Sequence, residues 1–244
     1  LPYRAGMRIL LALVALSLAA PVGAKDLVIR QRSATGVPGT APREEMVYFA
    51  GSKVVNDSAA ARTIVDLDAQ TITTADKTKR TYTVVTFDEL GAQLETLRKE
   101  LDKLPPEAKK MMGALFEEGP PVGVTSTGKT DTIAGYRAAE YALAGGPYTG
   151  SVWTTESIPT PPEFRRWKKI EQSSGASRGP GRQLGEAMEK LKGFPLRTHI
   201  ETKTAGQSFL VSSEVLDVKE TSPPAEILSI PPGFTRQTSA VPAP

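Results

Sequence analysis

The sequence predicts an α+β fold: a single curved antiparallel β-sheet, or half-barrel, with helices packed across its concave face. Two observations predict it. Short runs rich in β-branched residues follow one another with brief polar turns between them, which is typical of an antiparallel meander and not of βαβ units. Two helical insertions interrupt these runs, so the chain alternates sheet, helical pair, sheet, helical pair, sheet.

The start of the chain has the features of a secretory leader. Arg8 follows Met7, residues 9–20 are almost all apolar, and Val22-Gly23-Ala24 is a small-residue cleavage site. The apolar run is shorter than the ~20 residues that cross a bilayer core, so a membrane anchor is the less favoured interpretation. We expect upstream residues plus the leader in 1–24 (leader 7–24), one domain at 25–236 and a disordered tail at 237–244. The mature protein is expected in the periplasm or secreted, after cleavage near Ala24.

Composition narrows the classes of function. The chain has no cysteine, so neither a disulfide nor a lipid-anchoring thiol is available. The formal charge is +3, and it falls to +1 without residues 1–24, because Arg4 and Arg8 lie there. The sequence pI of 9.0 therefore does not indicate a nucleic-acid partner.

The first half of the domain is predicted to be mostly strand. Asp68-Ala69-Gln70 separates two β-branched runs, as in a hairpin. Residues 76–79 form the next predicted turn. The expected strands are 27–32, 46–55, 62–67, 71–74 and 80–86.

A helix is predicted directly after these strands. Thr86 and Glu89 have the spacing of a capping box. Leucines then recur at alternating steps of four and three, which places them on one helical stripe: Leu90, Leu94, Leu97, Leu101 and Leu104. Pro105-Pro106 ends this helix, and residues 107–116 start a second. Packing of the stripe on the protein's own sheet is favoured over a dimer seam.

The second half repeats this organisation. Strands are predicted within 122–143 and at 151–156, helices at 163–172 and 183–191, and strands at 196–203 and 207–218. In the first of the late strands Leu196, Thr198 and Ile200 alternate with Arg197, His199 and Glu201, which predicts one apolar and one polar face. The chain closes with 227–230 and Pro231-Pro232-Gly233-Phe234.

Residues 123–130, Gly-Val-Thr-Ser-Thr-Gly-Lys-Thr, fit the pattern of a phosphate-binding loop. That loop works between a buried strand and a helix, whose N-terminal amides hold the phosphates. Here residues 117–121, Glu-Glu-Gly-Pro-Pro, occupy the place of the apolar strand that the loop requires. After the pattern, residues 132–136 indicate a strand and turn and not a helix. We expect a hairpin with a Gly-Lys turn, and no nucleotide.

The remaining polar residues do not form a catalytic pattern. His199 is the only histidine, and alone it builds neither a metal site nor a triad. Asp66 and Asp68 flank a turn, where carboxylates commonly bond the backbone. Glu117 and Glu118 have no further oxygen ligands at suitable spacing. The sequence predicts no catalytic residue, no cofactor and no metal, and a protein that is not an enzyme.

One basic segment leaves two interpretations open. Its cations surround a tryptophan, an arrangement that suits transient contact with an anionic membrane surface. The favoured alternative is a solvated helix face. The residues are Arg165, Arg166, Trp167, Lys168 and Lys169.

Residues 63–74, 79–84 and 133–141 resemble an uncharacterised family of exported bacterial proteins, of the domain of unknown function 4412 type. Residues 152–156 and 230–234 fit as well, so the resemblance extends over most of residues 46–236. Members resemble the periplasmic lipoprotein-carrier (LolA/LppX-like) superfamily, in which a curved antiparallel sheet wraps an apolar cavity lidded by helices. The resemblance implies this fold and compartment, and apolar-ligand binding by analogy.

The expected function is therefore binding of a lipid or other apolar ligand between sheet and helical lid, with a lipid or acylated protein as partner. The alternative is a non-catalytic envelope interaction module with a filled core. The side chains expected to form the ligand or lid surface are Leu90, Leu94, Leu97, Leu101, Met111, Met112, Leu115 and Phe116.

Overall fold

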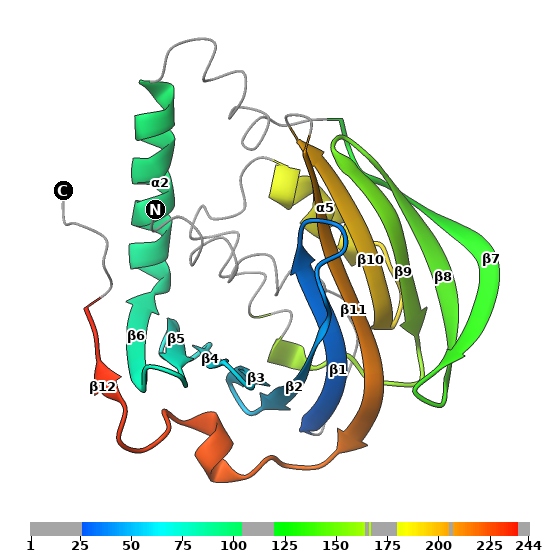
Figure 1. Cartoon of the computed structure of the whole chain (residues 1–244). Coiled ribbons are helices and arrows are strands. Elements are labelled where there is room, and N and C mark those ends of the chain that lie inside the picture. The colour runs from blue at the N-terminus through cyan, green and yellow to red at the C-terminus, as the bar shows by residue number, and fades with distance from the viewer. Residues whose placement is uncertain (1–25, 104–119, 164–165, 167–179, 205–206, 239–244) are drawn as a thin grey trace.

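The computed structural model describes residues 26–103, 120–163, 166, 180–204 and 207–238. It confirms the predicted fold class, since these residues form one strongly curved sheet with helices on its concave side (Figure 1). All neighbouring strands are antiparallel except β12 and β6, a short parallel pair. The predicted leader and most of the predicted tail lie outside the described residues.

The twelve strands of the described sheet run in the order β12-β6-β5-β4-β3-β2-β1-β11-β10-β9-β8-β7. Their bounds are β1 Leu27–Gly36, β2 Arg43–Ala50, β3 Lys53–Ser58, β4 Ala61–Asp66, β5 Thr71–Asp76, β6 Thr81–Thr86, β7 Gly123–Ile133, β8 Tyr136–Gly145, β9 Tyr148–Thr155, β10 Phe194–Thr204, β11 Gln207–Glu220 and β12 Thr235–Arg236. Among the described residues, the helices with defined bounds are α2 (Phe87–Asp102), α5 (Pro180–Glu189) and a 3-10 helix, η2 (Ala225–Leu228).

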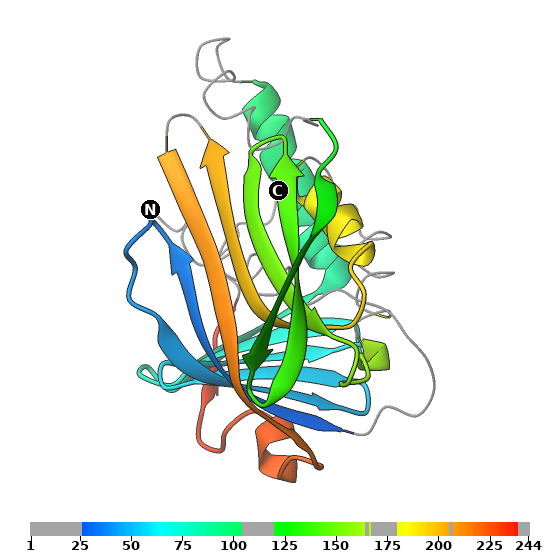
Figure 2. The same cartoon turned by 90° about the vertical axis from the view of Figure 1, so that its right-hand side faces the viewer.

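The sheet consists of two meanders joined through β1. Strands β2 to β6 follow one another in sequence, and so do β7 to β11 apart from the insertion that contains α5. β1 pairs with β2 on one side and with β11, near the end of the chain, on the other. In Figures 1 and 2 the two meanders stand at a steep angle to each other, so the sheet encloses a concave side.

One predicted strand was wrong. Residues 46–55 do not form one strand. They comprise the last part of β2 and the first part of β3, joined by a two-residue turn at Gly51-Ser52. Gly51 has φ of +61°, a conformation that glycine adopts without the penalty of a Cβ. The β-branched residues on both sides concealed this turn in the sequence.

The predicted hairpin between β4 and β5 is confirmed. The Asp66 carboxylate accepts hydrogen bonds from the backbone amides of Asp68 (3.1 Å) and Ala69 (3.0 Å). Asp66 is therefore a turn residue, as the sequence predicted.

The phosphate-loop pattern lies within β7, which is a strand over its whole length and is followed by β8 and not by a helix. The predicted hairpin is confirmed, but its turn is at Ala134-Gly135. The predicted Gly-Lys turn was wrong. Gly128, with φ of +75°, lies between Ser126 and Thr130, where the register of the pairing between β7 and β8 shifts.

Helix α2 begins as predicted. The Glu89 carboxylate accepts the Thr86 amide (2.7 Å), and the Thr86 hydroxyl accepts the Glu89 amide (3.1 Å), which completes the capping box. Phe87 is buried in the core, and Leu90 packs against the same cluster. Beyond this first turn the helix rises from the end of β6 (Figure 1).

The last described residues, 221–238, form a segment that we call the C-terminal strap. It leaves β11, crosses the convex face beneath β2 and β3, and ends beside β6 (Figure 1). Ile227 and Leu228 pack there on Tyr48, Val55 and Ile64. β2 and β3 thus contribute buried side chains to both faces of the sheet, because Val47, Phe49 and Val54 lie in the main core cluster.

Candidate ligand-binding surface

The predicted lid residues are only partly accounted for. Leu90 is half-buried against the core. Leu94, Leu97 and Leu101 lie in α2, as the spacing predicted, but their side chains are outside the described part of the structure. Met111, Met112, Leu115 and Phe116 lie outside the described residues altogether. Their role as a ligand or lid surface stays a prediction.

The predicted basic segment is represented by one residue. Arg166 is exposed, and its guanidinium is hydrogen-bonded to the carboxylate of Asp68 in the β4–β5 turn. This hydrogen bond holds the pKa of Asp68 below its usual range. Arg165, Trp167, Lys168 and Lys169 lie outside the described residues, so membrane contact also stays a prediction.

Helix α5 packs on the concave face of β7 to β10 (Figures 1 and 2). The apolar stripe of the helix and of the residues just after it packs against strand side chains that point inward. Its members are Leu184, Ala187, Met188 and Leu191. We call this group the α5 cluster; its strand members are Leu143, Tyr148, Val152 and Ile200. Burial raises the pKa of the Tyr148 hydroxyl to about 12, so this phenol stays protonated at physiological pH.

A second apolar cluster covers the other half of the concave side. It begins at Leu27 and Ile29 in β1 and continues through Phe49, Val65 and Ile72 towards Phe87. We call it the main cluster. Ile158, in the segment that follows β9, belongs to it as well, so this segment joins the second meander to the first.

A row of polar side chains lies between the two apolar groups, and sequence analysis did not predict it. Cross-strand pairing aligns Thr198 of β10 with Ser213 of β11, Ser213 with Ser33 of β1, and Ser33 with Arg43 of β2. Directly paired residues share a face of the sheet, and Thr198 also pairs with Val152 of the α5 cluster. This polar row therefore lies on the concave face. Exposure increases along it, from buried Thr198 to half-buried Ser213 and Ser33 and exposed Arg43.

Glu163 is a buried carboxylate in the segment between β9 and α5. Burial raises its pKa, and the Asp26 carboxylate adds to this, whereas a backbone hydrogen bond and Arg166 act the other way. A raised pKa of this origin follows from loss of water around the carboxylate and does not require a catalytic role.

Several charged residues of the opposite face of β7–β11 are paired with one another. Arg197 donates to Asp131 (2.9 Å) and Glu214 (2.8 Å), and its guanidinium lies 5.7 Å from the centre of the Trp153 ring. Lys129, the lysine of the phosphate-loop pattern, lies 3.2 Å from Glu140. His199 is exposed on the polar face of β10, as predicted.

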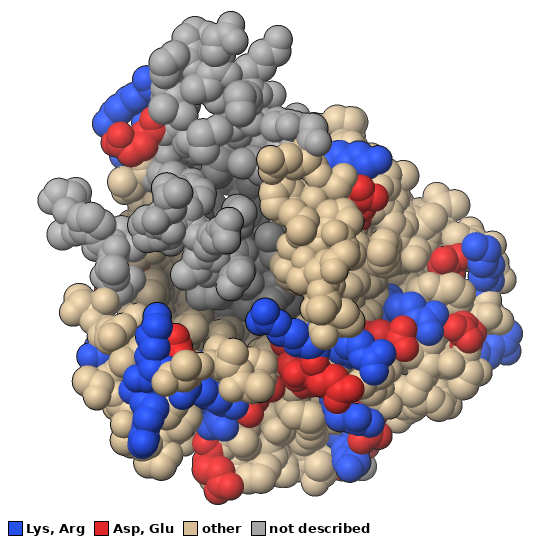
Figure 3. Space-filling model, in the orientation of Figure 1, with Lys and Arg blue, Asp and Glu red and all other residues tan. Residues whose placement is uncertain are grey.

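Charges of both signs alternate over the described surface in the view of Figure 3. The described part of this face has no large region of one sign, in agreement with the modest net charge. Among the described residues no three His, Asp or Glu side chains are grouped as metal ligands. None of the described helices combines the length and apolar character needed to cross a bilayer.

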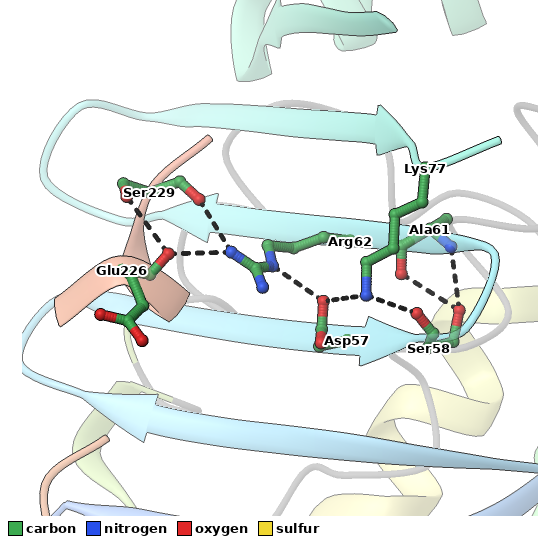
Figure 4. A network of polar contacts seen from close by, with 7 residues as sticks. All are labelled: Asp57, Ser58, Ala61, Arg62, Lys77, Glu226 and Ser229. Atoms are coloured by element: carbon green, nitrogen blue, oxygen red, sulfur yellow. Dashed lines mark hydrogen bonds and ion pairs between the residues drawn. The ribbon is translucent and has the colours of Figure 1, made fainter. Parts of the chain in front are cut away.

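A network on the convex face is structural (Figure 4). Arg62 and Lys77 both contact the carboxylate of Asp57, at 2.8 Å each. Burial, and next the Asp57 charge, raise the pKa of nearby Tyr48. The same Arg62 holds the C-terminal strap, so the network fastens two parts of the chain.

Residues 47–234 match the family described as domain of unknown function (DUF4412). The chain belongs to this family. The resemblance noted from residues 63–74 and 133–141 is thereby confirmed. No curated protein matches the DUF4412 chain in sequence.

Three solved structures illustrate what the DUF4412 chain is similar to. An uncharacterised conserved protein from Thermus thermophilus is 7% identical, with a TM-score of 0.46 over 88% of this chain and 91% of that one. The LolA superfamily protein NE2245 from Nitrosomonas europaea is 10% identical, with a TM-score of 0.31 over 91% and 96%. PNGF-II is 12% identical, with a TM-score of 0.38, and the match covers 88% of this chain but only 32% of PNGF-II. At these scores the similarities carry no argument about ligand or activity.

Proposed function

We propose that the protein is a non-enzymatic binding protein of the cell envelope that holds an acyl chain or other apolar ligand against the concave face of its sheet. The observation that carries this proposal is the distribution of apolar side chains. Two separate apolar groups, the main cluster and the α5 cluster, line the concave face on either side of the polar row. Each methylene of a ligand buried there would contribute about 0.8 kcal/mol.

The two helices are proposed to form the lid, and their described contacts with the sheet differ. α5 is fixed to the sheet along its apolar stripe, whereas the described side chains of α2 join the core through Phe87 and Leu90, in its first turn. A lipid or an acylated protein is the proposed partner, and the segment 165–169 is proposed to approach the membrane surface.

A non-catalytic interaction module with a filled core is the second candidate. The near-complete burial of Leu27, Phe49, Val152 and Ile200 favours it, since a packed core has this property. The two candidates differ in whether a ligand replaces protein contacts on the concave face.

Native mass spectrometry of protein purified from its own host tests the proposal. A co-purified mass of a few hundred daltons, lost after extraction with organic solvent, is expected for the binding protein. The extracted protein should then bind a fluorescent fatty acyl probe at one site. An empty protein that does not bind such probes at micromolar concentrations contradicts the proposal and favours the filled core.

A further inference from the structure

Thr198 is a buried polar residue whose hydroxyl lacks a partner. Its side chain is 1% exposed, and Oγ1 has no hydrogen bond among the residues that the structure describes. Buried hydroxyls are nearly always hydrogen-bonded, because the group loses its water on burial and must replace it. An unpaired hydroxyl on the face proposed to bind ligand therefore points to an acceptor that the ligand itself brings.

The surroundings of Thr198 define what that ligand looks like. On one side Thr198 pairs with Val152, and Ile200 follows it on the same face, so the α5 cluster begins here. On the other side it pairs with Ser213, from which the polar row continues to Ser33 and Arg43. A molecule with an apolar part and a polar part matches this boundary.

The polar part nearest Thr198 must be uncharged. Along the polar row the first cation is Arg43, three strands from Thr198, or about 14 Å at ordinary strand spacing. Among the described residues of the row, a carboxylate at Thr198 would have no adjacent counter-ion, and a charge buried in this way costs far more than a neutral carbonyl. The carbonyl oxygen of an ester or amide accepts a hydroxyl hydrogen bond and has no net charge.

We propose that Thr198 donates a hydrogen bond from Oγ1 to the carbonyl oxygen of a fatty acyl ester or amide. The acyl chain then lies against the apolar side chains beside the polar row, and the head group extends past Ser213 and Ser33 towards Arg43. This inference rests on the proposed function and specifies its ligand: a neutral acyl compound, not a free fatty acid.

Three probes with the same fluorophore separate the contributions: the glycerol ester of pyrenedecanoic acid, the free acid, and decylpyrene, which has no carbonyl. Thr198→Val removes the hydroxyl and keeps the shape, and Thr198→Ser is the matched control that keeps the hydroxyl. Titrations use the delipidated full-length protein. Loss of one neutral hydrogen bond should weaken binding of the ester to Thr198→Val about three- to tenfold. Its binding to Thr198→Ser and the binding of decylpyrene to both variants should change less than about twofold.

The outcomes are distinct. Thr198→Val should melt at or above the wild-type temperature, since it removes an unpaired buried hydroxyl, and this shows that its loss of affinity is not unfolding. Unchanged ester affinity in Thr198→Val, or an equal loss for decylpyrene, overturns the hydrogen bond while the proposed function stands. Tighter binding of the acid than of the ester overturns the neutral head group. If no probe binds the wild type, both proposals fail.

Discussion

Arg62 donates a hydrogen bond of 2.8 Å from Nη1 to the backbone carbonyl of Glu226, although 164 residues separate them in the chain (Figure 4). The same nitrogen donates to the carbonyl of Ser229 at 3.2 Å, and Nε donates to Asp57 at 2.8 Å. One buried guanidinium thus connects β3, β4 and the C-terminal strap. The geometry suits arginine and not lysine, because several donors in one plane are needed.

Arg62→Met should lower the free energy of unfolding by about 2–4 kcal/mol, because the Ser229 carbonyl loses the Arg62 donor while the Glu226 carbonyl keeps only the Ser229 hydroxyl and the Asp57 carboxylate keeps Lys77. Urea denaturation measures the loss. Arg30→Met is the control: Arg30 is exposed, its nearest oxygen of Glu44 is 3.6 Å away, and the change should cost less than about 0.5 kcal/mol. Equal losses in the two variants would contradict the role given to Arg62.

Asp57 should make stability depend on acid pH. Burial alone would raise its pKa, but hydrogen bonds from Arg62 and Lys77 outweigh burial and hold the pKa below its usual value. Since the folded pKa is the lower one, the stabilisation is complete above the unfolded value of about 3.9 and is lost as the pH falls through the folded pKa. The difference in unfolding free energy between wild type and Asp57→Asn should therefore be constant above about pH 5 and shrink below about pH 4. A difference that is independent of pH would refute this assignment.

Glu163 should behave in the opposite way. Burial raises its pKa, so keeping this carboxylate charged at neutral pH destabilises the folded protein. Glu163→Gln should be more stable than wild type near pH 7, and the gain should disappear as the pH falls through the raised folded pKa to the unfolded value of about 4.3. Urea midpoints at several pH values test this, with the exposed Glu156→Gln as control. A variant that is less stable than wild type at neutral pH would show that Glu163 makes a stabilising bond.

Leu184 and Leu97 should respond differently to truncation. Leu184→Ala removes a buried member of the α5 cluster and should cost about 2–5 kcal/mol with or without ligand. If α2 is a lid, Leu97→Ala should cost less than that and should weaken binding of a fluorescent fatty acyl probe. Parallel urea melts and probe titrations compare the variants. A large stability loss in Leu97→Ala, together with no probe binding by the wild type, would identify α2 as permanent core.

Lys129 should be dispensable. It is exposed, lies in a strand and pairs with Glu140, so Lys129→Ala should change the unfolding free energy by less than about 0.5 kcal/mol. Millimolar ATP should not shift the melting temperature of wild type or variant. A shift of several degrees that is lost in the variant would restore the phosphate-loop interpretation.

The features that could be predicted from the sequence are local ones. The capping box of Thr86 and Glu89 depends on two residues three apart, and the Asp66 turn depends on a carboxylate next to the amides that it bonds. The alternation of Thr198 and Ile200 with His199 is also visible in the sequence, since strand faces follow from a period of two. Such signals lie within a few residues of one another.

The features that could not be predicted depend on pairing between distant segments. Thr198 in sequence is simply a threonine in an apolar face; that Ser213 and Ser33 extend it into a polar row follows only from the register of β10, β11 and β1. The strap is similar, since the sequence does not specify which strands Ile227 and Leu228 cover. Residues 62 and 226 share no local pattern that would suggest their contact.

The position of β1 determines the order in which the molecule can be assembled. Its second neighbour, β11, consists of residues 207–220, so a chain that emerges N-terminus first completes the meander β2–β6 long before β1 has its partner. Until then one edge of β1 is open to pairing with other chains, the usual route to aggregation. A chain cut before residue 207 should therefore expose this edge of β1 and aggregate more readily than the complete chain.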